Sequence, residues 1–407
     1  MSISLLQHTQ GIQGYQLLRN EYSSDTYTAH LSSREHIQRC VECKSFKVTA
    51  TAVSQREIKA LPFGTKKTIL KITMHRLRCH DCGVYRMERI PFTSTSSSRV
   101  TKHLVRTVLD LRKHMSIKAV ANYYGLSWST VKDIEKSHLK KKYKHVNLRE
   151  VKAIGIDEIF MGKTLGYKGY LTIVRDLETG AVLDVAQGKK GSALNDFANK
   201  LKKTQAKIET IAVDLAPSFT SWISTNFPDA TIVYDHFHII KLMNEKLNRI
   251  RRRTMNTLEN HEKSELKNRR WHFVINKENL NPKATEELKR CNQIFSELST
   301  AYTLKESLRN IYSLATSKEL ADIAFKRWFD MAKASAIPEL ITMANTIKQH
   351  IDGVLAFWST GGITSASMEG FNNKVGWLTR QAYGYRDEEY LILKIYDLPN
   401  LKVAKEL

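Results

Sequence analysis

The sequence contains few cysteines, no long apolar run and too few acidic residues to balance its basic ones. Five cysteines in 407 residues are too few for a disulfide scaffold, so we expect a reducing, intracellular compartment. No run of about 18 apolar residues occurs, which argues against a transmembrane helix. The first residues show no basic segment followed by a long apolar core, so we expect no signal peptide.

The deficit of acidic residues is concentrated in the N-terminal third of the chain. The 64 Lys and Arg residues outnumber 41 Asp and Glu residues, a net charge of +23. Residues 1–150 hold 27 basic and 11 acidic residues, or +16, so the remaining residues carry only +7. Such an asymmetry indicates a polyanion-binding module joined to a near-neutral body. Neither terminus shows a long amphipathic basic helix of the kind that binds membranes. This pattern favours nucleic acid as the partner.

Four of the cysteines form two C-x2-C pairs, the spacing at which two thiolates wrap one metal ion. The pairs are Cys40 with Cys43 and Cys79 with Cys82. Between them, residues 46–53 and 68–74 have the pattern of β-strands, and a hairpin would return the second pair to the first. Four thiolates make a tetrahedral zinc site, so we expect a zinc ribbon. The alternatives are two unrelated reduced pairs or a redox motif, and a redox motif would need only one pair.

Residues 117–135, which follow a polar segment at 93–99 and a helical pattern, match a helix-turn-helix. Ala121 is small where two helices would cross, Gly125 suits a turn with positive φ, and Ser127 can cap the second helix. A plain helical hairpin inside a larger fold is the alternative. On the second helix we expect groups that reach the major groove, Trp128, Ser129, Thr130 and Lys132, and further along it groups that meet phosphates, Lys141 and Lys142.

From residue 152 the pattern predicts three strands in a row, then a helix, a strand, a helix and a strand. The predicted strands are 153–160, 170–175, 181–186, 208–215 and 230–235. This order is that of the RNase H-like fold, in which the first and fourth strands are neighbours. Asp157 on the first strand and Asp214 at the end of the fourth would then lie side by side. Glu158 would point to the opposite face, so we discount it as a ligand.

Two converging carboxylates repel each other unless a cation lies between them. Mg²⁺ prefers hard oxygen ligands, and two Mg²⁺ ions held by three carboxylates can promote phosphodiester transfer. Residues 236–350 read as almost wholly helical, with strong basic runs and no strand pattern. A third carboxylate, Glu369, begins the next helix. The polar groups that can share its side of that helix or lie close by are Asn372, Asn373, Lys374 and Arg380. A glutamate in a helix is by itself most often a solvated surface group.

These motifs together resemble the DDE insertion-sequence transposases of the ISL-three type, over nearly the whole chain. The segments that carry the resemblance are the two cysteine pairs, the helix-turn-helix, Gly-Ile-Asp-Glu at 155–158, Ala-Val-Asp-Leu-Ala-Pro-Ser at 212–218, Tyr-Asp-His-Phe-His at 234–238, Met-Glu-Gly-Phe-Asn-Asn-Lys at 368–374, Arg380, and Tyr-Gly-Tyr-Arg at 383–386. The resemblance implies a metal-dependent cut-and-paste reaction on short terminal inverted repeats.

Carried over residue by residue, the resemblance implies a catalytic triad of Asp157, Asp214 and Glu369 that binds Mg²⁺ or Mn²⁺. Three residues of the Tyr-Asp-His-Phe-His segment, Asp235, His236 and His238, are expected near the active site; alternatively, Asp235 and His238 only stabilise a turn. Asn372, Asn373, Lys374 and Arg380 are expected near the site as well. The expected partners are terminal-repeat and target DNA, with a dimer or other homo-oligomer on DNA and no membrane, in a bacterial cytoplasm at the nucleoid.

The expected architecture is an α/β RNase H-like catalytic core interrupted by an all-α insertion. A β-rich zinc ribbon and an α-helical helix-turn-helix precede it. The expected boundaries are 1–95 for the ribbon, 96–150 for the helix-turn-helix, 151–250 and 351–407 for the two parts of the core, and 251–350 for the insertion. Two other functions stay open: a domesticated, inactive transposase that regulates by binding DNA, and a stand-alone structure-specific nuclease. Inverted repeats flanking the gene would favour the transposase over the regulator.

Overall fold

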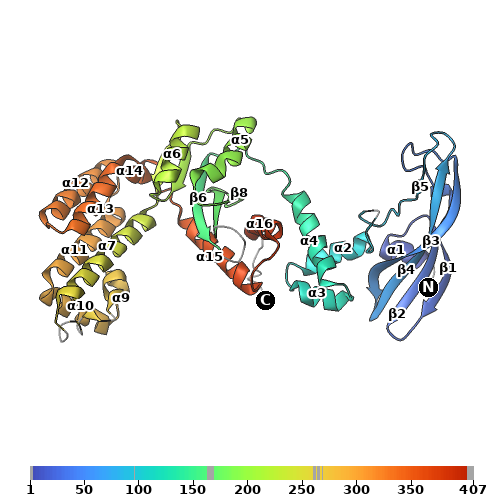
Figure 1. Ribbon diagram of the computed structural model, residues 1–407, viewed down its shortest axis with the longest axis horizontal. Coiled ribbons are helices and arrows are strands. Elements are labelled where there is room, and N and C mark those ends of the chain that lie inside the picture. The colour runs from blue at the N-terminus through green and yellow to red at the C-terminus, as the bar shows by residue number, and fades with distance from the viewer. Residues whose placement is uncertain are drawn as a thin grey trace. The chain divides into compact units, whose positions relative to one another are not determined.

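The computed structural model describes residues 3–95, 97–162, 169–259, 263, 266–267 and 269–400. The chain divides into two compact units, Met1–Lys142 and Tyr143–Leu407, whose elements are labelled in Figure 1. None of the helices in the described part of the chain has the length and apolarity that a membrane crossing needs.

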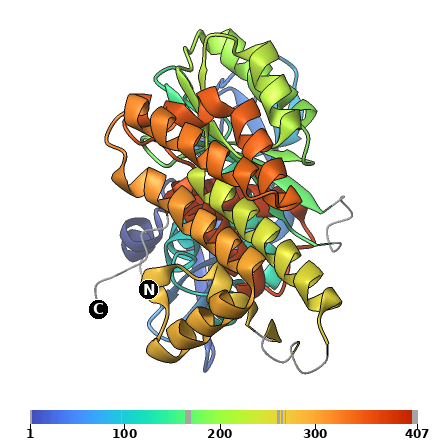
Figure 2. The ribbon, with the colours of Figure 1, turned by 90° about the vertical axis from the view of Figure 1, so that its left-hand side faces the viewer.

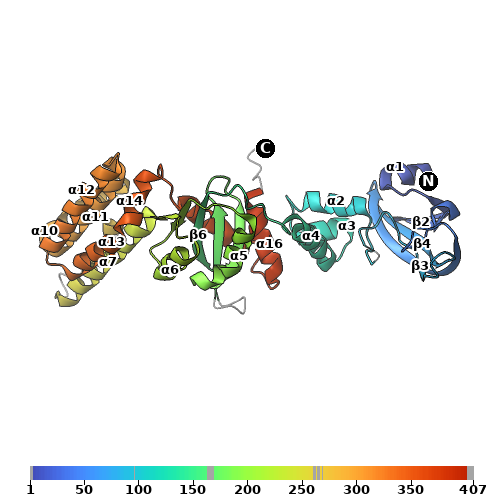
Figure 3. The same ribbon diagram turned by 90° about the horizontal axis from the view of Figure 1, so that it is seen from above.

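The N-terminal unit begins with a twisted sheet. Its elements are α1 (Ile3–Gln10), β1 (Tyr15–Tyr22), β2 (Thr26–Ser33), β3 (Val48–Phe63), β4 (Lys66–Cys79) and β5 (Tyr85–Met87). The strand order is β1-β2-β4-β3, with β5 also paired to β4. Alternate residues of β4 are buried, among them Leu70 and Ile72, and α1 lies against the curved sheet, as Figure 3 shows. The sequence analysis made no prediction for α1, β1 and β2.

The two strands predicted between the cysteine pairs are confirmed, and both are longer than expected. β3 and β4 form an antiparallel hairpin in which Val48 lies opposite Cys79. Because β3 starts a few residues after Cys43, the hairpin returns the second cysteine pair to the first. The hairpin therefore builds the zinc ribbon that the spacing predicted.

The helix-turn-helix follows as α2 (Lys102–Leu111), α3 (Ile117–Tyr124) and α4 (Trp128–Lys142). Gly125 ends α3 with φ of 60°, the left-handed region that glycine adopts without strain. The Oγ of Ser127 accepts a hydrogen bond from the Thr130 backbone N–H at 3.1 Å, which caps α4. Val120 and Val131 are fully buried between the helices. The predicted turn and cap positions are confirmed, and Ala121, predicted where the two helices cross, is buried.

The second unit contains a five-stranded mixed sheet. Its strands are β6 (Ala153–Phe160), β7 (Tyr170–Asp176), β8 (Val182–Gln187), β9 (Thr210–Val213) and β10 (Thr231–Tyr234), in the order β10-β9-β6-β7-β8. β6, β7 and β8 form an antiparallel meander, whereas β9 and β10 run parallel to β6. This is the RNase H-like order, and the predicted neighbourhood of the first and fourth strands is confirmed.

Helices cover both faces of this sheet. On one face, α5 (Asn195–Thr204) and α6 (Pro217–Asn226) pack against residues such as Ile154 and Ile156 of β6. On the other face, α15 (Ala366–Gln381) and α16 (Glu388–Asp397) pack against Leu171 and Ile173 of β7. The face under α15 is the one that matters for the site described below.

A helical insertion separates β10 from α15. Its helices are α7 (His236–Thr257), α9 (Arg270–Val274), α10 (Pro282–Ile294), α11 (Ser296–Leu314), α12 (Lys318–Ala334), α13 (Pro338–Gln349) and α14 (Ile351–Ser359). Figure 2 shows the longer of these helices lying side by side. α7 starts directly after β10, so the expected boundary after residue 250 falls inside this helix.

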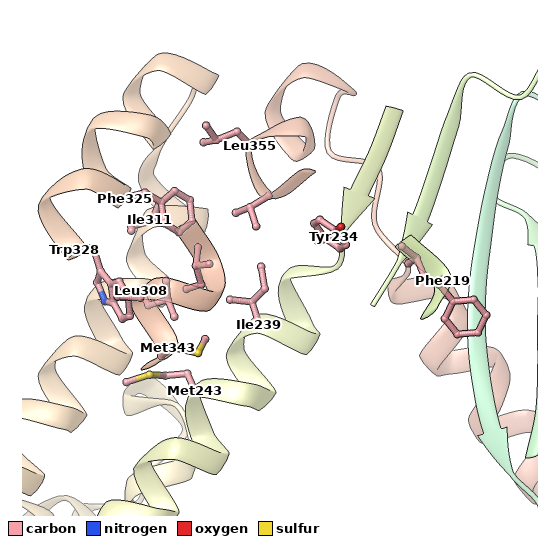
Figure 4. Close-up of a cluster of buried hydrophobic side chains, with 14 of the residues drawn as sticks. Phe219, Tyr234, Ile239, Met243, Leu308, Ile311, Phe325, Trp328, Met343 and Leu355 are labelled. Atoms are coloured by element: carbon pink, nitrogen blue, oxygen red, sulfur yellow. The ribbon is translucent and has the colours of Figure 1, made fainter. Parts of the chain in front are cut away.

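The insertion and the sheet share one continuous hydrophobic core. In Figure 4, Tyr234 at the end of β10 lies between Phe219 of α6 and the insertion side chains Ile239 and Met243. Farther into the insertion, Trp328 is fully buried and donates its Nε1–H to the carbonyl of Leu304 at 2.8 Å. The insertion is therefore packed onto the sheet at the point where its first helix leaves β10.

Candidate active site and nucleic-acid interface

Asp157 lies in the middle of β6, and Asp214 directly follows β9, the neighbouring parallel strand. In the register of β6 and β9, Gly155 lies opposite Ala212, and each aspartate follows two residues later. Asp214 is the first residue after β9, and its Oδ1 accepts a hydrogen bond from the Ala216 backbone N–H at 3.1 Å. The register therefore brings the two backbones to the same edge of the sheet.

The Asp157 side chain is held at both oxygens. Oδ1 accepts from the backbone N–H of Glu158 at 2.7 Å, and Oδ2 accepts from Nδ2 of Asn372 on α15 at 2.7 Å. Burial raises the pKa of Asp157 above its usual value, and the charges of Asp214 and Asp235 raise it further, against the opposing effects of the Glu158 N–H and His238. The carboxylates thus repel one another in the absence of a cation.

Asn372 also presents an acceptor that no protein group satisfies. Its Oδ1 is buried and has no hydrogen-bond partner among the described residues. The amide orientation is set by Asp157, because only the nitrogen can donate to a carboxylate. An unsatisfied buried oxygen is costly, and a hydrated cation next to Asp157 would supply the missing donor.

Asp235 lies beside the same strand ends but is enclosed. It is 2% exposed, and its backbone N–H donates to the Val213 carbonyl, the last of β9, at 3.1 Å. Burial alone would raise the pKa of Asp235, but hydrogen bonds from the side chains of His238 and Ser365 and from the backbone N–H of Phe237 lower it below its usual value. Asp235 is therefore an ionised carboxylate surrounded by protein donors.

The two histidines of the Tyr-Asp-His-Phe-His segment have different surroundings. The hydrogen bond that His238 donates to Asp235 raises the pKa of His238 against the effect of burial, and Asp214 and Asp157 raise it further. His238 is thus electrostatically coupled to all three aspartates. His236 instead packs among aromatic rings, with ring centroids 5.2 Å from Tyr312, and burial lowers its pKa. The structure therefore brings His238 to all three aspartates, whereas His236 lies in an aromatic cluster with its Nδ1 3.7 Å from Oδ1 of Asp235.

Glu369 lies in the first turn of α15 with an exposed side chain. Its helix is the one that reaches Asp157 through Asn372, although the oxygens of Glu369, Asp157 and Asp214 do not all lie within 4.8 Å of one another. Asn373, Lys374 and Arg380 are exposed on the same helix. The role of Glu369 as the third ligand remains a prediction.

Glu158 is a group that the sequence analysis set aside. Burial raises its pKa to about 7, and the charges of Asp214 and Asp157 contribute in the same direction, against Lys189. The charges of Asp157 and Asp214 therefore affect the Glu158 carboxylate, even though strand alternation directs its Cβ to the other face of the sheet. Ser365, which bonds Asp235, was also missed, because a serine at the start of a helix reads as an ordinary cap.

The donor set at the strand ends fits a hard divalent cation. It consists of the carboxylates of Asp157, whose pKa is raised, and Asp214, together with the unsatisfied oxygen of Asn372. Mg²⁺ and Mn²⁺ are bound by carboxylate, amide carbonyl and water oxygens. The residues that could hold such an ion are Asp157, Asp214 and, from α15, Glu369.

The four predicted zinc ligands come together in the N-terminal unit. Their sulfur atoms all lie within 4.8 Å of one another, with 3.5 Å between Cys40 and Cys82 and 3.5 Å between Cys43 and Cys79. Tetrahedral Zn–S bonds of 2.3 Å would place sulfurs about 3.8 Å apart, close to this spacing. The backbone N–H of Glu42, together with that of Cys43, lowers the pKa of Cys40 to about 6 against burial. Against backbone N–H groups that lower them, the neighbouring cysteine side chains and burial raise the pKa of Cys43 to about 12 and also raise that of Cys82, so without metal the thiolate is favoured at Cys40. The spacing of the four sulfurs could hold zinc.

Two histidines close to the second cysteine pair are engaged elsewhere. Nδ1 of His75 lies 2.8 Å from Oε1 of Glu88, and Nε2 of His80 lies 2.8 Å from the Thr49 hydroxyl. Neither histidine is needed to complete the sulfur tetrahedron.

The second helix of the helix-turn-helix presents part of its predicted DNA face to solvent. Trp128 is 53% exposed, and the Lys132 ammonium lies 5.8 Å above its ring. The hydroxyls of Ser129 and Thr130 lie 3.0 and 2.7 Å from Ser127 Oγ, so they belong to the capping network. Lys141 and Lys142 are exposed near the end of α4. Which of these groups contact DNA remains a prediction.

Comparisons with known proteins agree with this arrangement. A family model described as "Transposase" matches residues 154–395, and a model of the helix-turn-helix domain of transposase family ISL3 matches residues 96–139. The chain is 28% identical over 398 residues, 96% of this chain and 97% of the relative, to the transposase for insertion sequence element IS1001 of Bordetella parapertussis.

Two further similarities are more distant. The transposase for insertion sequence element IS1557 of Mycobacterium tuberculosis is 27% identical over 365 residues, which cover 83% of this chain and 80% of the relative. The Drosophila P element transposase strand transfer complex aligns with a TM-score of 0.41 and 12% identity, over 78% of this chain and 96% of that one. The family model covers more than half of the chain and includes the sheet, the aspartates and α15, so the chain belongs to the ISL3 family of transposases.

Proposed function

We propose that this chain binds the terminal inverted repeats of a mobile element and catalyses Mg²⁺-dependent phosphodiester cleavage and strand transfer of DNA. The observation that carries the proposal is the matching position of Asp157 and Asp214 on adjacent parallel strands, two residues after the paired Gly155 and Ala212, together with the hydrogen bond from α15, the helix that bears Glu369, to Asp157. The relatives that cover most of the chain are themselves transposases of insertion sequence elements.

In the proposed reaction, Mg²⁺ or Mn²⁺ held at the carboxylates would activate the attacking hydroxyl and stabilise the leaving oxygen. The triad of Asp157, Asp214 and Glu369 supplies the fixed negative charge that holds the cations. Asn372 keeps the Asp157 carboxylate oriented through its 2.7 Å hydrogen bond. The exposed Lys374 and Arg380 on α15 are suited to contact DNA phosphates beside the site.

The N-terminal unit supplies recognition in this proposal. The zinc ribbon and helix-turn-helix would bind the terminal repeats, and Zn²⁺ would have a structural role. The catalytic site would act on both the repeat ends and the target DNA. We propose a dimer on DNA, so that two ends can be held together, and action at the bacterial nucleoid.

The test is a supercoiled donor plasmid carrying the terminal repeats, assayed with the wild type and single variants in Mg²⁺. Asp157→Ala, Asp214→Ala and Glu369→Ala should each reduce cleavage and strand transfer by about 10³-fold or more, because each removes one fixed charge from the cation site. Binding to the repeats should persist in all three, because it comes from the basic N-terminal unit. Ca²⁺ should support binding without turnover.

Two outcomes would change the proposal. Near-wild-type cutting by Glu369→Ala would show that the third ligand is another residue. Repeat binding without any cutting by the wild type, in Mg²⁺ or Mn²⁺, would favour the alternative of an inactive, DNA-binding regulator. Glu158→Gln should be far milder than the triad variants, because its backbone N–H, which holds Asp157, is unchanged.

A further inference from the structure

The carboxylate of Asp235 is fully engaged by protein donors. Oδ1 accepts from the backbone N–H of Phe237 at 3.1 Å. Oδ2 accepts from the Ser365 hydroxyl at 2.6 Å and lies 3.3 Å from Nδ1 of His238. The residue is 2% exposed. The two oxygens of Asp157 also have partners, but Asp157 is only partly buried, whereas Asp235 is enclosed and three protein groups surround its carboxylate. Asp235 therefore offers a cation less access than Asp157 does.

Ser365 immediately precedes α15, and it uses its hydroxyl in an unusual direction. A serine at this position normally accepts a hydrogen bond from the first turn of its own helix. Here the side chain makes no such bond, the backbone φ and ψ are −84° and 12°, and the hydroxyl instead donates to Asp235, 130 residues away in the chain. Ser365 is 2% exposed, so this bond is made in a dry environment.

Helix α15 is consequently tied to the strand ends at two points. Ser365 ties the start of the helix to the residue that follows β10, and Asn372, two turns farther on, ties it to Asp157 on β6. Glu369 lies on the segment between the two ties. A small shift of the start of α15 would therefore move Glu369 and Asn372 relative to Asp157 and Asp214.

We propose that Asp235 and Ser365 are positioning residues that form a buried latch, which sets the start of α15 so that its polar groups reach the cation site. The proposal rests on the proposed function, because the site that the latch serves is the one assigned there. It gives Asp235 a role different from that of the two neighbouring aspartates: Asp235 orients the helix that completes the site and does not bind the cation.

Substitution of Asp235 by asparagine separates this role from that of a ligand. In Asp235→Asn, Oδ1 can still accept from the Phe237 N–H, and Nδ2 can donate to the Ser365 oxygen and to His238, with the hydroxyl rotated. The latch therefore survives while the charge is lost. A cation ligand would not survive the same change, as in the matched variant Asp214→Asn.

The first measurement is cleavage of the donor plasmid as a function of Mn²⁺ concentration. Ser365→Ala and Asp235→Ala should each raise the half-maximal Mn²⁺ concentration by about tenfold or more, as loss of a supporting group around a metal site does. Asp235→Asn should keep about a tenth or more of wild-type cleavage, well above Asp214→Asn. The matched control is Ser335→Ala, which removes a serine hydroxyl bonded to the Ala332 carbonyl in the insertion and should leave the Mn²⁺ dependence unchanged.

The second measurement does not depend on catalysis. Thermal unfolding and Mn²⁺ binding by calorimetry are compared for Ser365→Ala, Asp235→Ala and the double variant. If the latch holds α15, the losses in melting temperature and in Mn²⁺ affinity are not additive. The double variant should be close to Asp235→Ala, because both changes break the same hydrogen bond. If the wild type proves unable to cut DNA, this measurement still decides on the latch while the proposed function fails.

The proposal would be overturned by Asp235→Asn behaving like Asp214→Asn, which would make Asp235 a ligand. It would equally be overturned by additive losses in unfolding, or by Ser365→Ala showing the wild-type Mn²⁺ dependence. Should Asp235→Ala fail to fold, Ser365→Ala and Asp235→Asn suffice, since both preserve the packing volume at the latch.

Discussion

Asp157 and Glu158 are adjacent carboxylates that share the influence of Asp214. The pKa of Glu158 is raised from its ordinary value of 4.5 to about 7, first by burial and then by its acidic neighbours. An acid whose pKa is higher in the folded state binds more protons when folded. The folded protein therefore loses stability as the pH rises from about 4.5 to about 7. A bound cation would offset this repulsion between Glu158 and its acidic neighbours.

Glu158→Gln removes that penalty in the metal-free protein. We expect its melting temperature to exceed that of the wild type by a few degrees at pH 8, which corresponds to about 1 kcal/mol in the free energy of unfolding. This difference should shrink towards pH 5. Melting temperatures of both proteins from pH 5 to pH 8, measured in a chelator, test this. A difference that stays constant over the whole range would contradict the assignment of the raised pKa to Glu158.

At the scale of elements, the zinc ribbon depends on the β3–β4 hairpin and on four thiolates that one ion would hold together. Cys40→Ser should lose zinc and weaken repeat binding, because a site with three thiolates no longer holds the turn that contains Cys43 against Cys79. The second unit should stay folded. Metal analysis and repeat binding are the measurements, and the absence of zinc from the purified wild type would refute the zinc assignment.

Helix α4 combines residues placed for base contact with residues placed for phosphate contact. Lys132 lies over the Trp128 ring near the start of the helix, whereas Lys141 is exposed near its end. We expect Lys132→Ala to relax sequence preference and Lys141→Ala to weaken binding to all sequences alike. For Lys141→Ala, the slope of log K against log salt should also fall by about 1. Binding to repeat and scrambled duplexes at several salt concentrations distinguishes the two, and equal effects of both variants would contradict the assignment.

At the scale of the whole molecule, the two units have separate cores, and the larger core of the second unit extends from one face of the sheet into the insertion. Trp328→Ala, far along the insertion, should lower the stability of the whole second unit by about 3–5 kcal/mol. We expect calorimetry to show one transition for residues 143–407 shifted down as a whole, with the transition of the N-terminal unit unchanged. A separate early transition of the insertion alone would show that it folds independently of the sheet.

Local sequence pattern was sufficient for much of this molecule. The neighbourhood of Asp157 and Asp214 was predicted from the order of elements along the chain, which is that of the RNase H-like fold. The Gly125 turn and the Ser127 cap follow from short-range rules, because turn geometry and capping act within a few residues. The same rules set strand lengths poorly, as the long β3 and β4 show, since strand pairing ends where the partner strand ends. The boundary expected after residue 250 falls inside α7, which starts directly after β10.

The surroundings of the site depended on contacts between residues far apart in the chain. Ser365 reads as a helix cap but bonds Asp235, and Glu158 was expected to face away from the aspartates but responds to Asp214. Asn372 was expected near the site, but its bond to Asp157 was not predicted. These partners are brought together by packing α15 against β6 and the end of β10, and by pairing β9 with β6. The burial of a side chain and the charges near it depend on all the groups that pack around it. Most of those groups are distant in the sequence, so a local pattern does not reveal them.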